Sequence, residues 1–101
     1  MEHHKLVRDR IPEIIADSGK TPVTRVLAQD EYRRCLRAKL DEEVAEFHKD
    51  QNIEELADIL EVVLALNESL GYSREELESA YLEKHEARGG FSDRVFLISK
   101  D

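Results

Sequence analysis

The fold depends on one stretch of the sequence, residues 40–66, which reads LDEEVAEFHKDQNIEELADILEVVLAL. Apolar residues recur at helical spacing on both sides of a short polar interval, Asp50–Asn52. Two helices that are joined by so short a connection lie antiparallel. We therefore predict a helical hairpin. Its first helix runs from near Asp30 to Asp50, and its second begins after Asn52, a plausible N-cap, and continues to Gly71.

The second helix of this hairpin is apolar around most of its surface, which is more than one partner helix can cover. Its apolar residues are Ile53, Leu56, Ile59, Leu60, Val62, Val63, Leu64, Leu66 and Leu70. We expect this helix to be buried on two sides, one of them a subunit interface. The predicted assembly is a homodimer or a homotetramer.

Further helices flank the hairpin. Pro12 suits the first turn of a short helix that ends at Gly19. Ser73 and Glu76 form a capping-box pattern at the start of a third long helix, which ends at Gly89.

Two β-prone runs lie outside these helices, at Thr21–Leu27 and Arg94–Ser99. Because an isolated strand is marginal on its own, we expect the two runs to pair beside the helices. The predicted fold class is mainly α, with an antiparallel helical hairpin, further helices and a small two-stranded β element in an oligomeric helix bundle. The chain length suits a single domain, residues 1–101.

Composition argues against several classes of function. The chain has 15 Lys and Arg against 23 Asp and Glu, a net charge of −8, which opposes non-specific binding to nucleic acid. No apolar run approaches the roughly 20 residues that span a bilayer, and the charged N-terminus has no signal-peptide core. Cys35 is the single cysteine, so no internal disulfide can form. We expect a cytoplasmic protein without nucleic-acid or membrane partners.

Acidic residues interrupt the apolar stripes of both hairpin helices. In a helical projection of about 100° per residue, Glu43 falls within the stripe of the first helix and Glu46 lies at its edge. The same projection places Glu55 within the stripe of the second helix and Asp58 at its edge. Four carboxylates gathered between adjacent helices repel one another strongly unless a cation is bound.

A divalent metal ion is the simplest explanation for these two acidic pairs. Ligation by carboxylate oxygens selects Mg²⁺, with Mn²⁺ as a possible substitute, over zinc. Mg²⁺ usually takes substrate phosphates as further ligands, so we predict a phosphate-bearing substrate. The alternative is that these acidic residues lie on solvated helix faces, as most such residues do in an acidic chain.

The acidic pattern resembles the signature of the MazG-like, all-α nucleoside triphosphate pyrophosphohydrolase superfamily. That signature is E-E-x-x-E on one helix and E-x-x-D on the next, and here its residues are Glu42, Glu43, Glu46, Glu55 and Asp58. Residues 5–15 and 88–91 are also similar to a short bacterial and phage subgroup that is often labelled phosphoribosyl-ATP pyrophosphohydrolase-like. The interval between the two acidic motifs is shorter here than in most of the superfamily.

The resemblance implies an enzyme that uses Mg²⁺. Glu43, Glu46, Glu55 and Asp58 would coordinate the ion, and Glu42 would join Glu43 in catalysis as an outer, water-orienting residue. The implied reaction is hydrolysis of a nucleoside triphosphate between its α- and β-phosphates, which yields a nucleoside monophosphate and pyrophosphate and clears unwanted nucleotides. Two alternatives remain open. One is phosphoribosyl-ATP hydrolysis in histidine biosynthesis, and the other is a non-catalytic helical dimerisation or regulatory module.

Several cationic residues are candidates for binding the substrate phosphates. Lys84 and Arg88 share one face of the third long helix, from which they could reach a triphosphate opposite the metal. Lys5, Arg8 and Arg10 form a second cationic group near the N-terminus, for which helix capping and surface pairing are at least as good interpretations as phosphate binding. Lys39 lies one helical turn before the first acidic pair, where it either contacts the ligand or neutralises local acidity.

Overall fold

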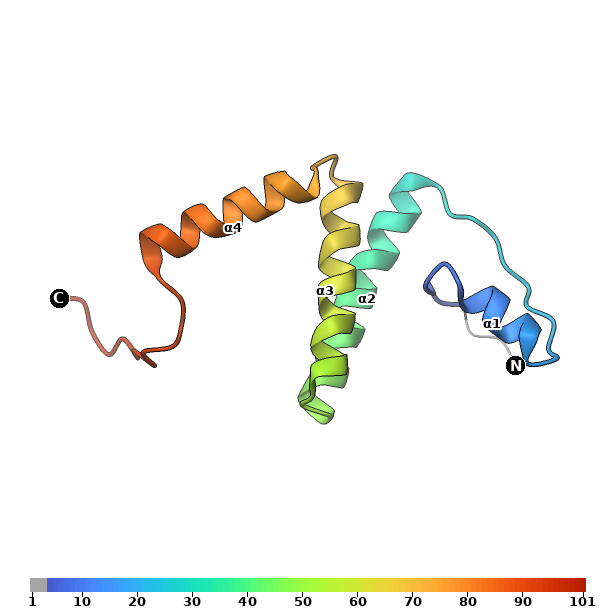
Figure 1. Ribbon diagram of the computed structural model, residues 1–101, viewed down its shortest axis with the longest axis horizontal. Coiled ribbons are helices and arrows are strands. Elements are labelled where there is room, and N and C mark those ends of the chain that lie inside the picture. The colour runs from blue at the N-terminus through green and yellow to red at the C-terminus, as the bar shows by residue number, and fades with distance from the viewer. Residues whose placement is uncertain (1–3) are drawn as a thin grey trace.

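The computed structural model describes residues 4–101, which contain four helices. They are α1 (Ile11–Asp17), α2 (Gln29–Lys49), α3 (Ile53–Ser69) and α4 (Arg74–Arg88). Figure 1 shows α2 and α3 side by side as an antiparallel hairpin, with α4 leaving the end of α3 on one side and α1 standing on the other. The predicted mainly α class and the predicted hairpin are therefore confirmed.

The helices begin and end at the signals that the sequence carries for them. The side chain of Asn52 accepts a hydrogen bond from the backbone N–H of Glu55 at 3.0 Å and caps α3. At the start of α4, the Ser73 hydroxyl accepts from the N–H of Glu76 at 3.1 Å, and the Glu76 carboxylate accepts from the N–H of Ser73 at 3.0 Å. Gly71 follows α3 with a φ of 90°, a left-handed conformation that costs glycine little. These local predictions are confirmed.

The hairpin is held at both of its ends. At one end the chain turns directly from α2 into α3 through residues 50–52. At the other end, the guanidinium of Arg33 on α2 donates two hydrogen bonds, of 3.1 and 2.5 Å, to the backbone carbonyl oxygen of Ser69, the last residue of α3. Because the last carbonyls of a helix have no partner within it, Arg33 acts as a C-cap supplied by the neighbouring helix.

The hydrophobic core of one chain is small. Among residues 4–101, the buried apolar side chains are Leu36 on α2 and Val62 on α3, which are 3% and 7% exposed. α4 packs on α3 alone, and the chain extends over 60 × 32 × 23 Å. Large apolar side chains therefore remain exposed on α3 and α4, at Leu56, Leu60, Tyr81 and Leu82. Even so, no helix among residues 4–101 has both the length and the hydrophobicity that a membrane crossing needs.

The predicted two-stranded β element is wrong. The structure assigns no strand within residues 4–101, and both β-prone runs, Thr21–Leu27 and Arg94–Ser99, are irregular. The first run connects α1 to α2, whereas the second follows α4, so the two lie on opposite sides of the hairpin in Figure 1. A β-prone segment without a partner has no ladder of hydrogen bonds to join, and its apolar side chains stay exposed here, Val26 at 98% and Ile98 at 91%.

Candidate metal centre

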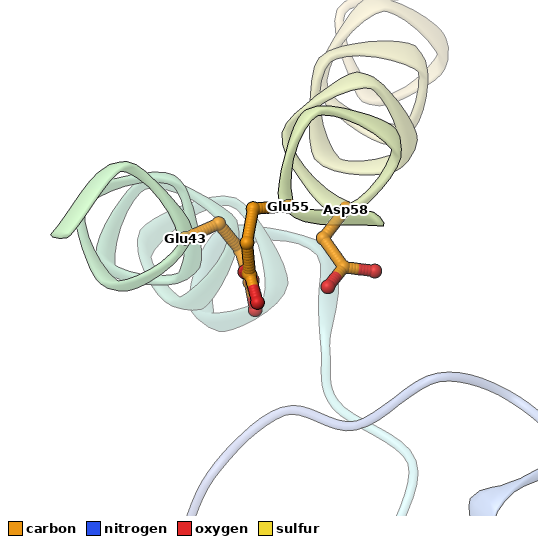
Figure 2. A group of neighbouring side chains, drawn as sticks. All are labelled: Glu43, Glu55 and Asp58. Atoms are coloured by element: carbon orange, nitrogen blue, oxygen red, sulfur yellow. The ribbon is translucent and has the colours of Figure 1, made fainter. Parts of the chain in front are cut away.

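Three carboxylates meet where α2 and α3 approach the turn between them. Figure 2 shows Glu43 reaching from α2, and Glu55 and Asp58 from α3, towards the same space. One oxygen from each carboxylate lies within 4.8 Å of the others, and all three residues are half-buried. Helical spacing explains the arrangement, because Glu55 and Asp58 are one turn apart on α3 and the antiparallel pairing brings Glu43 opposite them.

A second acidic group adjoins the first and shares one member with it. Glu46, Asp50 and Glu55 also place one oxygen each within 4.8 Å of one another, although Glu46 and Asp50 are exposed. The structure thus divides the four predicted metal ligands between two overlapping groups, with Glu55 common to both. Asp50 was missed by the sequence analysis, although its place one helical turn after Glu46 was a usable signal.

The electrostatics of the site are those expected of crowded carboxylates. Partial burial raises the pKa of Glu55 above the ordinary value for a glutamate, and the charges of the neighbouring acidic residues raise that pKa further. These neighbours, in order of decreasing effect, are Asp58, Glu46, Asp50 and Glu43. The site therefore favours an added positive charge, whether a proton or a metal ion.

Two cationic side chains already border the acidic group. The Lys39 ammonium lies 3.6 Å from a carboxylate oxygen of Glu43 and 3.4 Å from one of Glu42. From the N-terminal segment, Nη2 of Arg8 donates to a carboxylate oxygen of Asp58 at 2.8 Å. Arg8 and Asp58 are 50 positions apart, so no sequence periodicity could have predicted this pair.

The other predicted site residues lie at different distances from the acidic group. Glu42 takes part in neither acidic group and pairs with Lys39 on α2. Lys5 is exposed in the segment before α1. Lys84 and Arg88 lie on α4, which contacts α3 but not α2, and Figure 1 shows this helix running away from the hairpin. The structure of one chain therefore does not bring Lys84 and Arg88 to the acidic group.

The donor set fits a hard divalent cation. Glu43, Glu55 and Asp58 offer oxygen ligands from carboxylates, which Mg²⁺ and Mn²⁺ prefer. With Mg–O distances of about 2.1 Å, two ligand oxygens on opposite sides of one ion stand about 4.2 Å apart. The three carboxylate oxygens, which lie within 4.8 Å of one another, have separations of this order, and the coordination positions left over suit water or phosphate oxygens.

A cleft opens beside this acidic group, between the N-terminal segment and the hairpin. It has a volume of about 440 Å³, and Glu43 and Asp58 form part of its wall. Arg8 and Lys39 also line it, together with apolar side chains from residues 6–14, α2 and α3. The site is therefore a charged group at the edge of a partly apolar cleft.

Comparison with known proteins identifies the family. A family model described as dUTPase matches residues 11–89, most of the chain. The chain belongs to this dUTPase family. An uncharacterized protein of Mycolicibacterium smegmatis is 69% identical over 42 residues, which are 42% of this chain and 43% of that protein. The match thus spans less than half of this relative, and no solved structure matches the chain.

Membership in the dUTPase family corrects the resemblance inferred from the acidic motifs. The MazG-like superfamily and its phosphoribosyl-ATP subgroup were the wrong assignment, because the match over residues 11–89 is to dUTPase. Acidic pairs on the two helices of a hairpin can serve the same chemistry in unrelated proteins, so they do not by themselves distinguish one family from another. The reaction class predicted from the sequence, hydrolysis of a nucleoside triphosphate, agrees with a dUTPase family.

Proposed function

We propose that this protein is a Mg²⁺-dependent dUTP pyrophosphohydrolase. It cleaves dUTP between the α- and β-phosphates, releases dUMP and pyrophosphate, and so removes dUTP from the nucleotide pool. The observation that carries the proposal is the meeting of Glu43, Glu55 and Asp58 between α2 and α3 in a member of the dUTPase family. Such a group of carboxylates is suited to bind the cation that accompanies a triphosphate.

The carboxylates have distinct roles in this proposal. Glu43, Glu55 and Asp58 hold the cation, and Glu46 completes its surroundings from the second acidic group. Mg²⁺ bound there would shield the charge of the triphosphate and lower the pKa of a nearby water. Glu42, an exposed residue next to Glu43 on α2, orients the attacking water with the help of Glu43 and accepts its proton. The water oxygen attacks the α-phosphorus, the bond from that phosphorus to the α–β bridging oxygen breaks, and pyrophosphate leaves.

Cationic residues bind the phosphates in the same proposal. Arg8 and Lys39 already lie beside the acidic group, and each can exchange its carboxylate partner for a phosphate oxygen. Lys5 is close to Arg8 in the chain and extends this positive edge. Binding energy from these side chains would orient the triphosphate for in-line attack.

A product assay with a nucleotide panel tests the activity. The purified protein is incubated with dUTP, UTP, dCTP and dTTP, with and without Mg²⁺, and pyrophosphate is resolved from orthophosphate. We expect Mg²⁺-dependent release of pyrophosphate, fastest from dUTP. Release of orthophosphate would mean that a different bond is cleaved, and equal turnover of all four nucleotides would contradict dUTP as the substrate.

Variants of the acidic group separate metal binding from folding. Glu43→Gln and Asp58→Asn should abolish turnover and also the rise in melting temperature that Mg²⁺ produces, which corresponds to about 2.7 kcal/mol at a concentration one hundred times the Kd. Without metal, both variants should remain folded, because the relief of repulsion between carboxylates offsets the loss of the ion pair with Lys39 or Arg8. Glu54→Gln is the matched control, since Glu54 is an exposed α3 carboxylate outside both acidic groups. Full turnover in Glu43→Gln would contradict the metal assignment.

We also propose that the working protein is a homo-oligomer, at least a dimer. One chain exposes 9390 Å², whereas a compact monomer of this mass exposes about 5,900 Å². Its radius of gyration is 17.8 Å, against about 13 Å for a compact domain of this length. The excess surface of about 3,500 Å² per chain is sufficient for an obligate dimer interface, which buries about 2,000–5,000 Å² over both partners.

The interface in this proposal is the apolar face of α3 and α4. A groove between these helices is lined by apolar residues of both, including Val63, Leu66 and Leu77. In this proposal Lys84 and Arg88 bind phosphates in the acidic group of a second copy, because they do not reach this group within one chain. Sedimentation equilibrium measures the assembly, and we expect a dimer or tetramer that Leu66→Asp dissociates. A parent protein that is monomeric at micromolar concentration would contradict this proposal.

A further inference from the structure

The lining of the cleft beside the candidate metal centre changes from apolar to charged along the hairpin. On α2, the side chains that line it are Tyr32, Leu36, Lys39 and Glu43, in chain order. The lining of α2 therefore changes from apolar at Tyr32 to charged at Glu43, which are about 16 Å apart along the helix at 1.5 Å per residue. On α3, which is antiparallel, Asp58 and Glu61 lie towards the charged end, and Val62 and Ala65 follow towards the apolar end. Both helices therefore give the cleft the same polarity.

The outer wall of the cleft comes from the N-terminal segment. Leu6, Val7, Ile11 and Ile14 line the cleft on this side, together with the charged residues Arg8, Asp9 and Arg10. Helix α1 does not pack on another helix, and Leu6, Val7 and Ile11 are half-buried whereas Ile14 is exposed. The ion pair between Arg8 and Asp58, at 2.8 Å, holds this wall to the hairpin at the charged end.

A nucleotide has the same polarity as the cleft. Its triphosphate is strongly charged and needs cations, while its base is flat and largely apolar on both faces. The volume of about 440 Å³ is within the range of about 300–1,000 Å³ found for small-molecule sites. Apolar and aromatic walls with a few charged groups at one end are typical of such sites.

We propose that this cleft binds the base and sugar of the substrate, with Leu6, Val7, Ile11, Ile14 and Tyr32 around the base and Arg8 and Lys39 towards the phosphates. The proposal rests on the proposed function for the direction in which the nucleotide lies, since the acidic group marks the triphosphate end. In this arrangement the N-terminal segment determines which nucleoside is accepted. The acidic hairpin determines only that a triphosphate is cleaved.

The competing location is the groove between α3 and α4. That groove is also apolar, and Asn67 lines it with an amide that could hydrogen-bond to a base. However, the Asn67 amide nitrogen already donates to the backbone carbonyls of Tyr72 and Ser73, at 3.3 and 3.0 Å. The groove also contains no residue of either acidic group. The observations therefore favour the cleft.

Methyl NMR of the full chain tests this location without requiring catalysis. The probe is dUMP, titrated in the presence of EDTA so that no metal is bound, and inorganic phosphate is titrated in parallel. We expect dUMP, but not phosphate, to shift the methyl signals of Ile11, Ile14 and Val62. Shifts confined to Val63, Leu66 and Leu77 would overturn the proposal by locating the nucleoside in the α3–α4 groove. An absence of shifts from saturating dUMP would also overturn it.

A substitution in the outer wall gives a second, independent test. Ile14 is 58% exposed, so Ile14→Asn changes the cleft without removing a core residue. We expect the KM for dUTP to rise about tenfold, the low end of the effect of a lost apolar contact, with inhibition by inorganic tripolyphosphate unchanged. Val23→Asn is the control, because Val23 is 95% exposed in the segment between α1 and α2 and does not line the cleft.

The two proposals fail in different ways. If the protein hydrolyses dUTP but Ile14→Asn leaves its KM unchanged, the cleft assignment is wrong and the activity stands. If dUMP shifts the methyl signals of the cleft but no nucleotide is hydrolysed, the nucleoside site stands and the proposed activity is wrong. If the KM for dUTP and the inhibition constant for tripolyphosphate both change in Ile14→Asn, the side chain acts on the phosphate end, which contradicts a role in binding the base.

Discussion

The bond between Arg33 and the end of α3 offers a quantitative test of how the hairpin is stabilised. Arg33→Met retains the apolar stem of the side chain but removes the guanidinium that donates to the Ser69 carbonyl at 3.1 and 2.5 Å. A hydrogen bond from a charged donor contributes about 1.5–3 kcal/mol, and a cation at a helix C-terminus contributes about 0.3–1 kcal/mol. Because Ser69 is only half-buried, water recovers part of this loss. We expect the free energy of unfolding to fall by about 2 kcal/mol.

Urea unfolding followed by circular dichroism at 222 nm measures this change. The measurement is made at one matched protein concentration, because association would couple stability to concentration. Arg34→Met is the control, since Arg34 is the exposed neighbour on the same helix. The thermal midpoint of Arg33→Met should fall by about 10 °C for a chain of this length. If the two variants differ by less than about 0.5 kcal/mol, the Arg33 bond is not a significant constraint on the hairpin.

Three further predictions concern local features of the helices and the site. Asn52→Ala removes the cap of α3 and should cost about 1 kcal/mol in urea unfolding, and it should weaken Mg²⁺ binding in calorimetry because Glu55 is in the capped turn. Ser73→Ala breaks the capping box of α4 and should cost about 1 kcal/mol locally. The measurement is hydrogen exchange, which should become faster relative to the parent protein in α4 and less so in α3. Glu55 has a raised pKa in the folded state, so its contribution to stability is fully present below the unfolded pKa and is lost as pH rises through the folded pKa. The metal-free parent should therefore lose stability relative to Glu55→Gln as pH rises from 4 to 7, and parallel melting curves for the two proteins over that range would contradict this assignment.

The helix boundaries could be predicted because their causes are local. Asn52, Ser73 and Gly71 each act on backbone groups within a few residues, so a short window of sequence contains both the signal and its partner. The antiparallel hairpin follows almost as directly, since residues 50–52 leave the chain no room for another arrangement. The acidic group follows from both, because helical spacing and an antiparallel partner are sufficient to bring Glu43 opposite Glu55.

The β element could not be predicted correctly because its cause is not local. Val, Ile and Phe favour strands only when a partner strand supplies hydrogen bonds and a surface to pack on. In this chain the segments Thr21–Leu27 and Arg94–Ser99 lie on opposite sides of the hairpin, and the intervening helices keep them apart. The pair between Arg8 and Asp58 was missed for the same reason, since 50 residues separate its members. The local pattern of residues does not indicate which distant segments of the chain will meet, so features that depend on such contacts could not be predicted.

The acidic motifs could not identify the family, and the reason is chemical. Two acidic pairs on facing helices satisfy a divalent cation, and the cation and triphosphate make the same demand whichever nucleoside is attached. Selectivity for a nucleoside must come from side chains that contact its base and sugar. In our proposal those side chains are Leu6, Val7, Ile11, Ile14 and Tyr32, outside the acidic motifs. The family match over residues 11–89 includes Ile11, Ile14 and Tyr32 as well as the hairpin, so it rests on positions that the acidic motifs do not contain.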